Sequence, residues 1–278
     1  MAFRTIVVQV DNRKSAPARI DYACRLAVRD DAHLIGICPI PFANLAADFG
    51  AVATPEIIEV QRRYLAEDAE RAKTLFEEHV RRAGVRSEWR NPEGHPATVL
   101  AQAGRYADVV VAGQDDPEDS AMSAPAGLVE DLLFAVGRPV LTVPYIGAPE
   151  TLATRVLVAW NASREATRAL NDAIPLLKRA EKVTVLSVNP RPGDGGDGDV
   201  PSADICLHLA RHGVKAEAAQ TQARDIDAGD VILSRAADEG ADLIVMGAYG
   251  HARLREQILG GVTRTLLDHM TVPVLMSH

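Results

Sequence analysis

Apolar residues form short continuous runs along this chain, and longer segments of mixed polarity separate them. The first such run covers residues 5–10 (TIVVQV), and a similar run covers residues 155–160 (RVLVAW). Neither run alternates between apolar and polar residues, as a strand with one face in water would. Continuous runs are typical of strands in a parallel sheet that helices cover on both faces. The pattern therefore predicts an α/β protein.

The same runs recur in the same order in the second half of the chain. The segment ADVVVAG at 107–113 returns as ADLIVMG at 241–247, and the tripeptide PVL follows both copies at the same spacing. An internal repeat of this kind indicates two tandem copies of one structural unit. We expect the first domain to cover residues 1–146 and the second to cover residues 152–278, with a turn-prone link between them.

Each copy consists of alternating strands and helices. The expected strands are 5–10, one ending near 38, 108–112 and 139–143 in the first copy, and 155–160, one ending near 188, 242–246 and 273–276 in the second. The expected helices include 16–29, 55–82 and 96–105, and then 164–179 and 230–240. This alternation predicts right-handed crossovers and a doubly wound parallel sheet in each copy. Two such units can pack about a pseudo-two-fold axis, and we expect them to meet through their final strands.

Composition and charge narrow the class of partner. The chain is 47% hydrophobic and 24% charged, the balance of a soluble globular protein, and its formal net charge is −8. A negative net charge argues against nucleic acid or an anionic membrane as a partner. No apolar run approaches the length of about 18 residues that a membrane-spanning helix needs. We therefore expect no nucleic-acid partner and no membrane contact.

The cysteines and the start of the chain bear on location. Cys24, Cys38 and Cys206 are far apart and show no CxxC spacing, which suggests free thiols in a reducing compartment. The first residues resemble a strand more than a secretory signal. We expect a cytoplasmic protein.

The most informative segment begins at the end of the strand expected at 242–246 in the second copy. It reads MGAYGH at 246–251 and continues as GGVT at 260–263, where an amphipathic helix is expected to begin. In doubly wound folds the ligand crevice lies at such strand ends. Glycines let the backbone approach a phosphate, amides at a helix N-terminus favour an anion, and His251 with Arg253 and Arg255 would add positive charge. The pattern is compatible with a phosphate site and equally with glycines that only make tight turns.

The spacing Gly247-x2-Gly250-x9-Gly260 resembles the nucleotide-loop signature of the universal stress protein family. The chain ending at 272–276 (VPVLM) resembles the last strand of that family, and VAWNAS at 158–163 resembles its first strand and turn, usually Val-Ala-x-Asp-Gly-Ser. The similarity covers essentially the whole chain, once per half. The chain is therefore similar to a tandem universal stress protein, which implies two Rossmann-like domains of the adenine nucleotide alpha hydrolase-like type.

The resemblance also implies a set of nucleotide-binding residues for ATP or AMP. Ala159, Asn161 and Val188 would line the adenine and ribose part of the pocket, Met246 and Gly247 would pass under the nucleotide, and Gly250, Gly260, Gly261 and Val262 would wrap the phosphates. His251 and Thr263, which lie within the same two segments, complete the candidate set.

Two residues of the second copy depart from the family pattern. ATP-binding members usually have Ser or Thr where this chain has Gly261, so a hydroxyl donor to phosphate is lost. The first-strand Asp of the family is Asn161 here, which keeps an acceptor but loses the charge.

The first copy departs further. Gly113 is kept, but Asp116 and Ala126 stand where the second copy has its next two loop glycines. The segment QDDPED at 114–119 places four carboxylates where phosphates would lie, and like charges repel. We expect a degenerate site in the first copy, although Asp11 retains the family's acid.

Two weaker signals favour ordinary explanations. The segment at 193–198 matches GxGxxG, but it opens no apolar helix and is better explained as a loop. Cys206, His208 and His212 have a spacing that can bind zinc, but no fourth ligand is evident. We predict no metal site.

Three functions remain open at this stage. The leading hypothesis is a stress-associated sensor or regulator that binds an adenine nucleotide in its second copy, with no catalytic residues. The first alternative is an interaction or scaffold protein that binds no nucleotide, in which the charged helix at 55–82 leaves room for a protein partner or a homodimer contact. The second is a slow ATP hydrolase, for which His251 is the recognisable candidate base.

Overall fold

The computed structural model describes residues 2–41, 55–119, 125–190, 202–223, 225–249 and 260–278. These residues form one continuous sheet of ten strands in the order β3-β2-β1-β4-β5-β10-β9-β6-β7-β8. The first half contributes β1 (Thr5–Gln9), β2 (His33–Ile37), β3 (Ser87–Arg90), β4 (Val109–Gly113) and β5 (Val140–Val143). The second half contributes β6 (Arg155–Ala159), β7 (Lys182–Val188), β8 (Ala216–Thr221), β9 (Leu243–Gly247) and β10 (Val274–Ser277).

The two halves join through their last strands, as the sequence predicts. All strand pairs within each half are parallel, whereas β5 and β10 pair antiparallel with Leu141 opposite Leu275. Outward from this pair, the strand order is the same on both sides. The tandem chain thus has the pseudo-two-fold arrangement of a homodimer.

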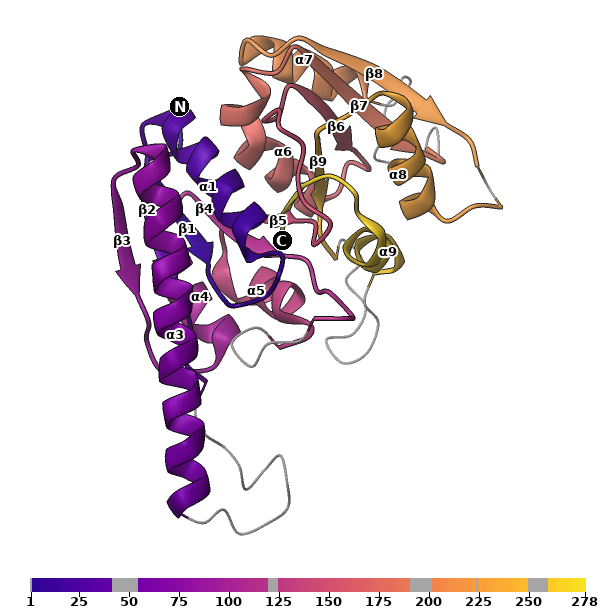
Figure 1. Ribbon diagram of the computed structural model, residues 1–278. Helices are drawn as coiled ribbons and strands as arrows, with labels where there is room; N and C mark the ends of the chain where they lie inside the picture. The colour runs from indigo at the N-terminus through magenta and orange to yellow at the C-terminus, as the bar shows by residue number, and fades with distance from the viewer. Residues whose placement is uncertain (1, 42–54, 120–124, 191–201, 224, 250–259) are drawn as a thin grey trace.

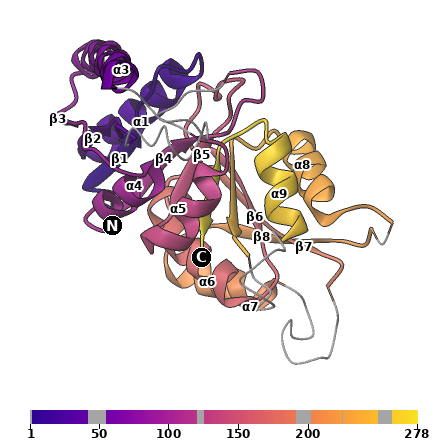
Figure 2. The same cartoon turned by 90° about the horizontal axis from the view of Figure 1, so that it is seen from below.

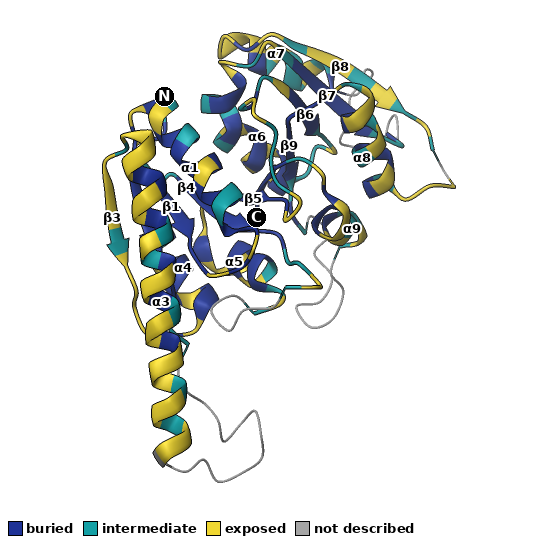
Figure 3. Ribbon diagram, in the orientation of Figure 1, coloured by how far each residue is buried: buried dark blue, intermediate teal, exposed yellow. Residues whose placement is uncertain are grey.

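Helices cover both faces of the sheet (Figures 1 and 2). One layer contains α1 (Ala16–Asp30), α3 (Pro55–Ala83), α6 (Arg164–Leu177) and α7 (Ala203–Arg211). The other contains α4 (Pro96–Gly104), α5 (Leu128–Val136), α8 (Ala228–Asp238) and α9 (Gly261–His269). The inner strands are almost wholly buried, which explains their continuous apolar sequences, whereas the edge strands β3 and β8 are largely exposed (Figure 3).

Successive residues of a strand face opposite layers, and β6 shows this clearly. Val156 and Val158 pack in the core under α1, α3, α6 and α7, whereas Leu157 packs in the core under the other four helices. The same alternation sends Ala159 and Trp160 to opposite faces. Ala159 and Trp160 can therefore contact only ligands or side chains on their own side of the sheet.

Helix α3 is the longest element, with 29 residues, and its first turns extend beyond the sheet (Figure 1). Its bounds agree with the helix expected at 55–82. Ile57, Val60 and Tyr64 are exposed on this projecting part. Within the described residues no helix is both long enough and apolar enough to cross a membrane.

Candidate functional site

The carboxyl ends of β6, β7 and β9 bring the predicted strand-end residues together. Ala159 is in register with Met246 of the neighbouring strand β9, and β7 on the other side of β6 ends at Val188. The strand that follows β6 in the chain, β7, lies on one side of β6, and β9 lies on its other side. The carboxyl ends of β6 and β9 therefore form a topological switch point of the sheet. Ala159, Val188 and Val262 all pack on the side of α8 and α9. The helix start at Gly260 lies on the same side.

Gly247 makes a close backbone contact that no other residue would allow. A Cβ atom at this position would lie 2.3 Å from the backbone nitrogen of Ala166 and 2.5 Å from the carbonyl carbon of Glu165. The end of β9 therefore packs directly against the first turn of α6. Packing accounts for this glycine without any ligand, and it also fixes how β9 and α6 border the crevice.

The loop between β6 and α6 is held by short local hydrogen bonds. Oδ1 of Asn161 accepts from the backbone N–H of Ser163 at 3.1 Å, and Oγ of Ser163 accepts from the N–H of Ala166 at 3.1 Å. Ser163 is thus the N-cap of α6. Ala162 has φ 56°, a left-handed conformation that favours glycine, the residue the family usually has there.

The N-terminus of α9 presents backbone amides without a side-chain cap. Gly260 is the N-cap residue, with φ −56° and ψ 123°, and within the described residues no side chain accepts a hydrogen bond from this helix start. Gly261 is exposed and Val262 is half-buried. Thr263 is only 2% exposed, and its Oγ1 accepts from the N–H of Tyr249 at 3.4 Å, so its side chain ties β9 to α9. Gly250 and His251 lie outside the described residues.

One carboxylate lies close to this helix start. Asp227 is the N-cap of α8, and its Oδ1 accepts from the N–H of Gly229 at 2.8 Å and from the hydroxyl of Thr265 at 3.2 Å. Its Oδ2 lies 3.8 Å from where a Cβ on Gly261 would stand. This charge opposes an anion beside Gly261, against the attraction of the α9 amides.

The first half supports the residue that leads into the glycine loop. Tyr249 has φ 59°, and its ring stacks on Phe134 of α5 with 4.6 Å between centroids. His278 packs edge-on against Phe134 at 4.8 Å, and its Nδ1 lies 3.1 Å from the carbonyl oxygen of Ala248. Burial raises the pKa of the Tyr249 hydroxyl well above its ordinary value, with Glu130 and Asp131 acting in the same direction.

A buried ion pair lies at the carboxyl ends of β1 and β4 in the first half. Nη2 of Arg19 lies 2.8 Å from Oδ2 of Asp11, and both side chains are at most 1% exposed. Nε of Arg19 donates to the carbonyl oxygen of Gln9 at 2.8 Å. A Cβ on Gly113 would lie 2.0 Å from Nη1 of Arg19, so the guanidinium packs against the end of β4, on the side where the α6 backbone packs against Gly247 in the second half. Arg19 was not predicted from the sequence because nothing in its helical position marks its partner.

The acidic loop of the first half is tied to the segment after β1. Oδ1 of Asp115 accepts from Nη1 of Arg13 at 3.2 Å, and its Oδ2 accepts from the N–H of Gly127 at 2.7 Å. Oδ2 of Asp119 accepts from the N–H of Lys14 at 2.6 Å. These carboxylates therefore act as internal acceptors in addition to carrying negative charge.

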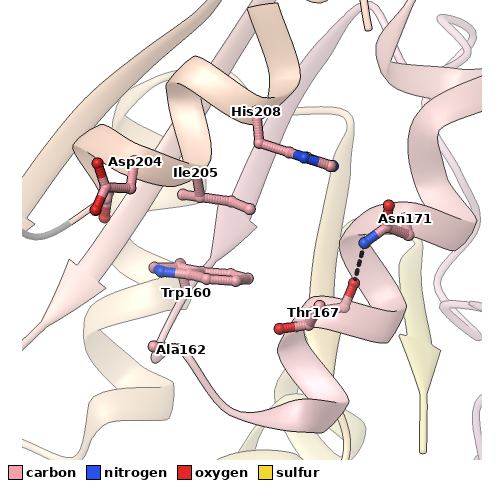
Figure 4. A pocket seen from close by; sticks show the side chains of 8 residues that line it. Trp160, Ala162, Thr167, Asn171, Asp204, Ile205 and His208 are labelled. Carbon is pink, nitrogen blue, oxygen red and sulfur yellow. Dashed lines mark hydrogen bonds between the residues drawn. The ribbon is translucent and has the colours of Figure 1, made fainter. Parts of the chain in front are cut away.

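A cavity of about 260 Å³ lies beside α6 and α7 in the second half (Figure 4). Its lining residues come from the loop after β6, from α6 and from the start of α7: Trp160, Ala162, Thr167, Asn171, Ser202, Asp204, Ile205 and His208. From the sequence, His208 was a candidate metal ligand only. Its ring centroid lies 4.6 Å from that of His212 with the two rings tilted, and the described residues contain no group of three or more potential metal ligands.

Comparisons with known proteins define the class of this fold. A universal stress protein from Archaeoglobus fulgidus has a TM-score of 0.75 at 19% identity, covering 98% of this chain and 97% of that chain. A Pseudomonas aeruginosa protein of unknown function has a TM-score of 0.59 at 16% identity, covering 99% of this chain and 92% of that chain. The chain therefore has the tandem, Rossmann-like fold of a solved universal stress protein.

Sequence comparison places the second half within a family. Residues 153–278 match the model of the universal stress protein family. A universal stress protein from Methanocaldococcus jannaschii is 42% identical over 45 residues, which is 16% of this chain and 28% of the length of that relative. The C-terminal half belongs to the universal stress protein family.

Proposed function

We propose that this protein is a stress-associated sensor or regulator whose C-terminal domain, residues 152–278, binds an adenine nucleotide, ATP or AMP. One observation carries the proposal. The ends of β6, β7 and β9 converge with the uncapped N-terminus of α9 at the switch point of a doubly wound sheet. Such a junction combines an apolar surface for a base with amides for a phosphate.

The base and ribose would lie against the strand ends. Ala159 and Val188 are half-buried and offer small apolar side chains on the side of α8 and α9, and Met246 closes the floor beneath them. Small-molecule sites are mostly apolar, with a few placed polar groups that give orientation. Asn161 is exposed at the mouth, where its amide would hydrogen-bond a ribose hydroxyl.

The phosphates would lie at the start of α9. The amides of Gly261 and Val262 stand at a helix N-terminus, where backbone donors and the helix dipole both favour an anion. Gly250 and His251 would complete this loop. The groups that the described part of the chain presents are mainly amides and small side chains, which suit binding more than the activation of water.

The first half, residues 1–146, would serve as a structural partner with a degenerate site. The acid that the first copy retains, Asp11, is held in a buried ion pair with Arg19, and Asp115 and Asp119 lie in the loop where phosphates would lie. We expect one nucleotide per chain.

Isothermal titration of the purified chain with ATP and with AMP tests the proposal. A Cβ on Gly260 would have no neighbour closer than 3.9 Å among the described residues, so Gly260→Leu should fold while its side chain blocks the α9 amides. We expect Gly260→Leu to weaken nucleotide binding by about tenfold or more. The matched control is Ala126→Leu at the equivalent exposed position of the first half, which should bind like the parent.

Absence of heat with both nucleotides at millimolar concentration would contradict the proposal and favour the interaction-protein alternative. A stoichiometry of two would contradict the degenerate first site. Release of inorganic phosphate above the buffer blank would instead favour the slow hydrolase.

A further inference from the structure

The cavity beside α6 and α7 lies on the face of the sheet opposite the proposed nucleotide site. Ala159 packs toward α8 and α9, whereas the next residue, Trp160, packs in the core under α6 and α7. The N–H of Trp160 still donates to the carbonyl oxygen of Leu186 at 2.8 Å, so the strand alternation continues through this residue. A molecule in this cavity would therefore be separated from the nucleotide by the sheet.

One side of the cavity is shaped to receive a planar ring. In Figure 4 the Trp160 ring is seen nearly edge-on beneath Ile205 and His208, and Thr167 and Asn171 stand across the cavity on α6. An indole face favours an offset-stacked aromatic ring and also attracts a cation placed over it. The apolar contact with Ile205 adds to the same surface.

The polar lining selects the charge of the occupant. Asp204 and His208 are the ionisable residues of the lining, and among the described residues no lysine or arginine borders the cavity. Nε2 of His208 is buried and has no hydrogen-bond partner in the part of the chain that the structure describes. A carboxylate together with an unpaired imidazole nitrogen favours a ligand that carries N–H donors and a positive charge, and disfavours a phosphate or carboxylate.

We propose that this cavity is a second ligand site that takes a small aromatic amine in its ammonium form. The ring would pack against the Trp160 indole beside Ile205, and the ammonium group would lie near Nε2 of His208, with the Asp204 carboxylate adding a longer-range attraction. The volume of about 260 Å³ is roughly nine times the volume that one water molecule occupies in the liquid. This space admits one aromatic ring and a short amino chain.

The fluorescence of Trp160 provides a direct test. The chain has only two tryptophans, and the other, Trp89, lies in β3 of the first half against Phe76. In the Trp89→Phe variant, titration with 2-phenylethylamine at neutral pH should change the emission of Trp160 saturably. The neutral analogue 2-phenylethanol should bind more weakly, and the anionic analogue 3-phenylpropionate should not bind. Isothermal titration of the unmodified chain with the same three molecules serves if the variant fails to fold.

A pair of matched variants tests the attraction by Asp204. Asp204→Asn should weaken the amine about two- to fivefold, as expected for a solvent-exposed ion pair. Asp230→Asn, in the first turn of α8, should leave the affinity unchanged. Saturating ATP should also leave it unchanged, because the two sites face opposite helical layers.

Three results would overturn the proposal: no saturable response to the amine at millimolar concentration, equal binding of the anionic analogue, or an equal effect of Asp204→Asn and Asp230→Asn. Competition between ATP and the amine would overturn the separation of the two sites. Because none of these measurements requires nucleotide binding, their failure is distinct from failure of the proposed nucleotide site.

Discussion

Gly261 is the position where one added hydroxyl group should most directly strengthen phosphate binding. It is the first residue of α9, it is exposed, and its φ lies outside the left-handed region. In the part of the chain that the structure describes, a Cβ there would meet only Oδ2 of Asp227, at 3.8 Å, which is an ordinary contact. Gly261→Ser therefore adds a donor beside the α9 amides without straining the backbone.

The expected gain follows from the strength of a hydrogen bond to a charged group. Such a bond contributes about 1.5–3 kcal/mol, which corresponds to roughly 10- to 150-fold in Kd. Asp227 is near enough to accept the same hydroxyl, so part of this gain is lost to competition. We expect Gly261→Ser to tighten ATP binding by about tenfold, measured by isothermal titration.

Gly261→Ala is the matched control because it adds the same Cβ without the hydroxyl. Both variants also lose a flexible glycine from the helix start, so this contribution cancels when they are compared. If the serine and alanine variants bind ATP equally, the phosphates do not lie at the start of α9, and the reasoning is refuted.

Three further predictions concern stability, and urea unfolding measures each of them. Gly247→Ala should lower the free energy of unfolding by about 2 kcal/mol or more, because the new Cβ would overlap the backbone of Ala166; an unchanged midpoint would show that β9 and α6 are not in this contact. Ala162→Gly should raise it by about 1 kcal/mol by relieving the left-handed conformation, and a lower midpoint would contradict that φ value. Arg19→Met should lower it by about 3–5 kcal/mol because Asp11 would be left buried and unpaired, and the double variant with Asp11→Asn should recover much of the loss; a double variant no better than the single one would count against the ion pair.

The repeated apolar runs were sufficient to predict most of the fold. Strands buried on both faces need continuous apolar sequences, and the two copies mark equivalent strands in each half. The pairing of the halves through β5 and β10 also followed from the repeat, because similar units tend to pack symmetrically. Helix ends were less certain: α8 begins at Ala228, two residues before the expected start, because Asp227 caps it.

The candidate site was only partly accessible from the sequence. Ala159, Val188 and Gly247 were predicted to line one crevice, and they lie at neighbouring strand ends of the switch point. The sequence did not predict why residue 247 must be a glycine, because Ala166, whose backbone contacts it, is far from it in the chain. The support of Tyr249 by Phe134 was missed for the same reason, because it joins one half to the other.

The sequence by itself determined the class of each element, the repeat and the strand ends where a ligand would lie, because these depend on local periodicity and on matching residues between the copies. Only the tertiary structure decided how the strand ends of the two halves differ. Arg19 makes a buried contact with Asp11 in the first half, and the neighbouring residues Ala159 and Trp160 face opposite helical layers in the second. Such contacts depend on which side chains the sheet and its two helical layers bring within a few ångströms, and spacing along the chain does not specify that distance.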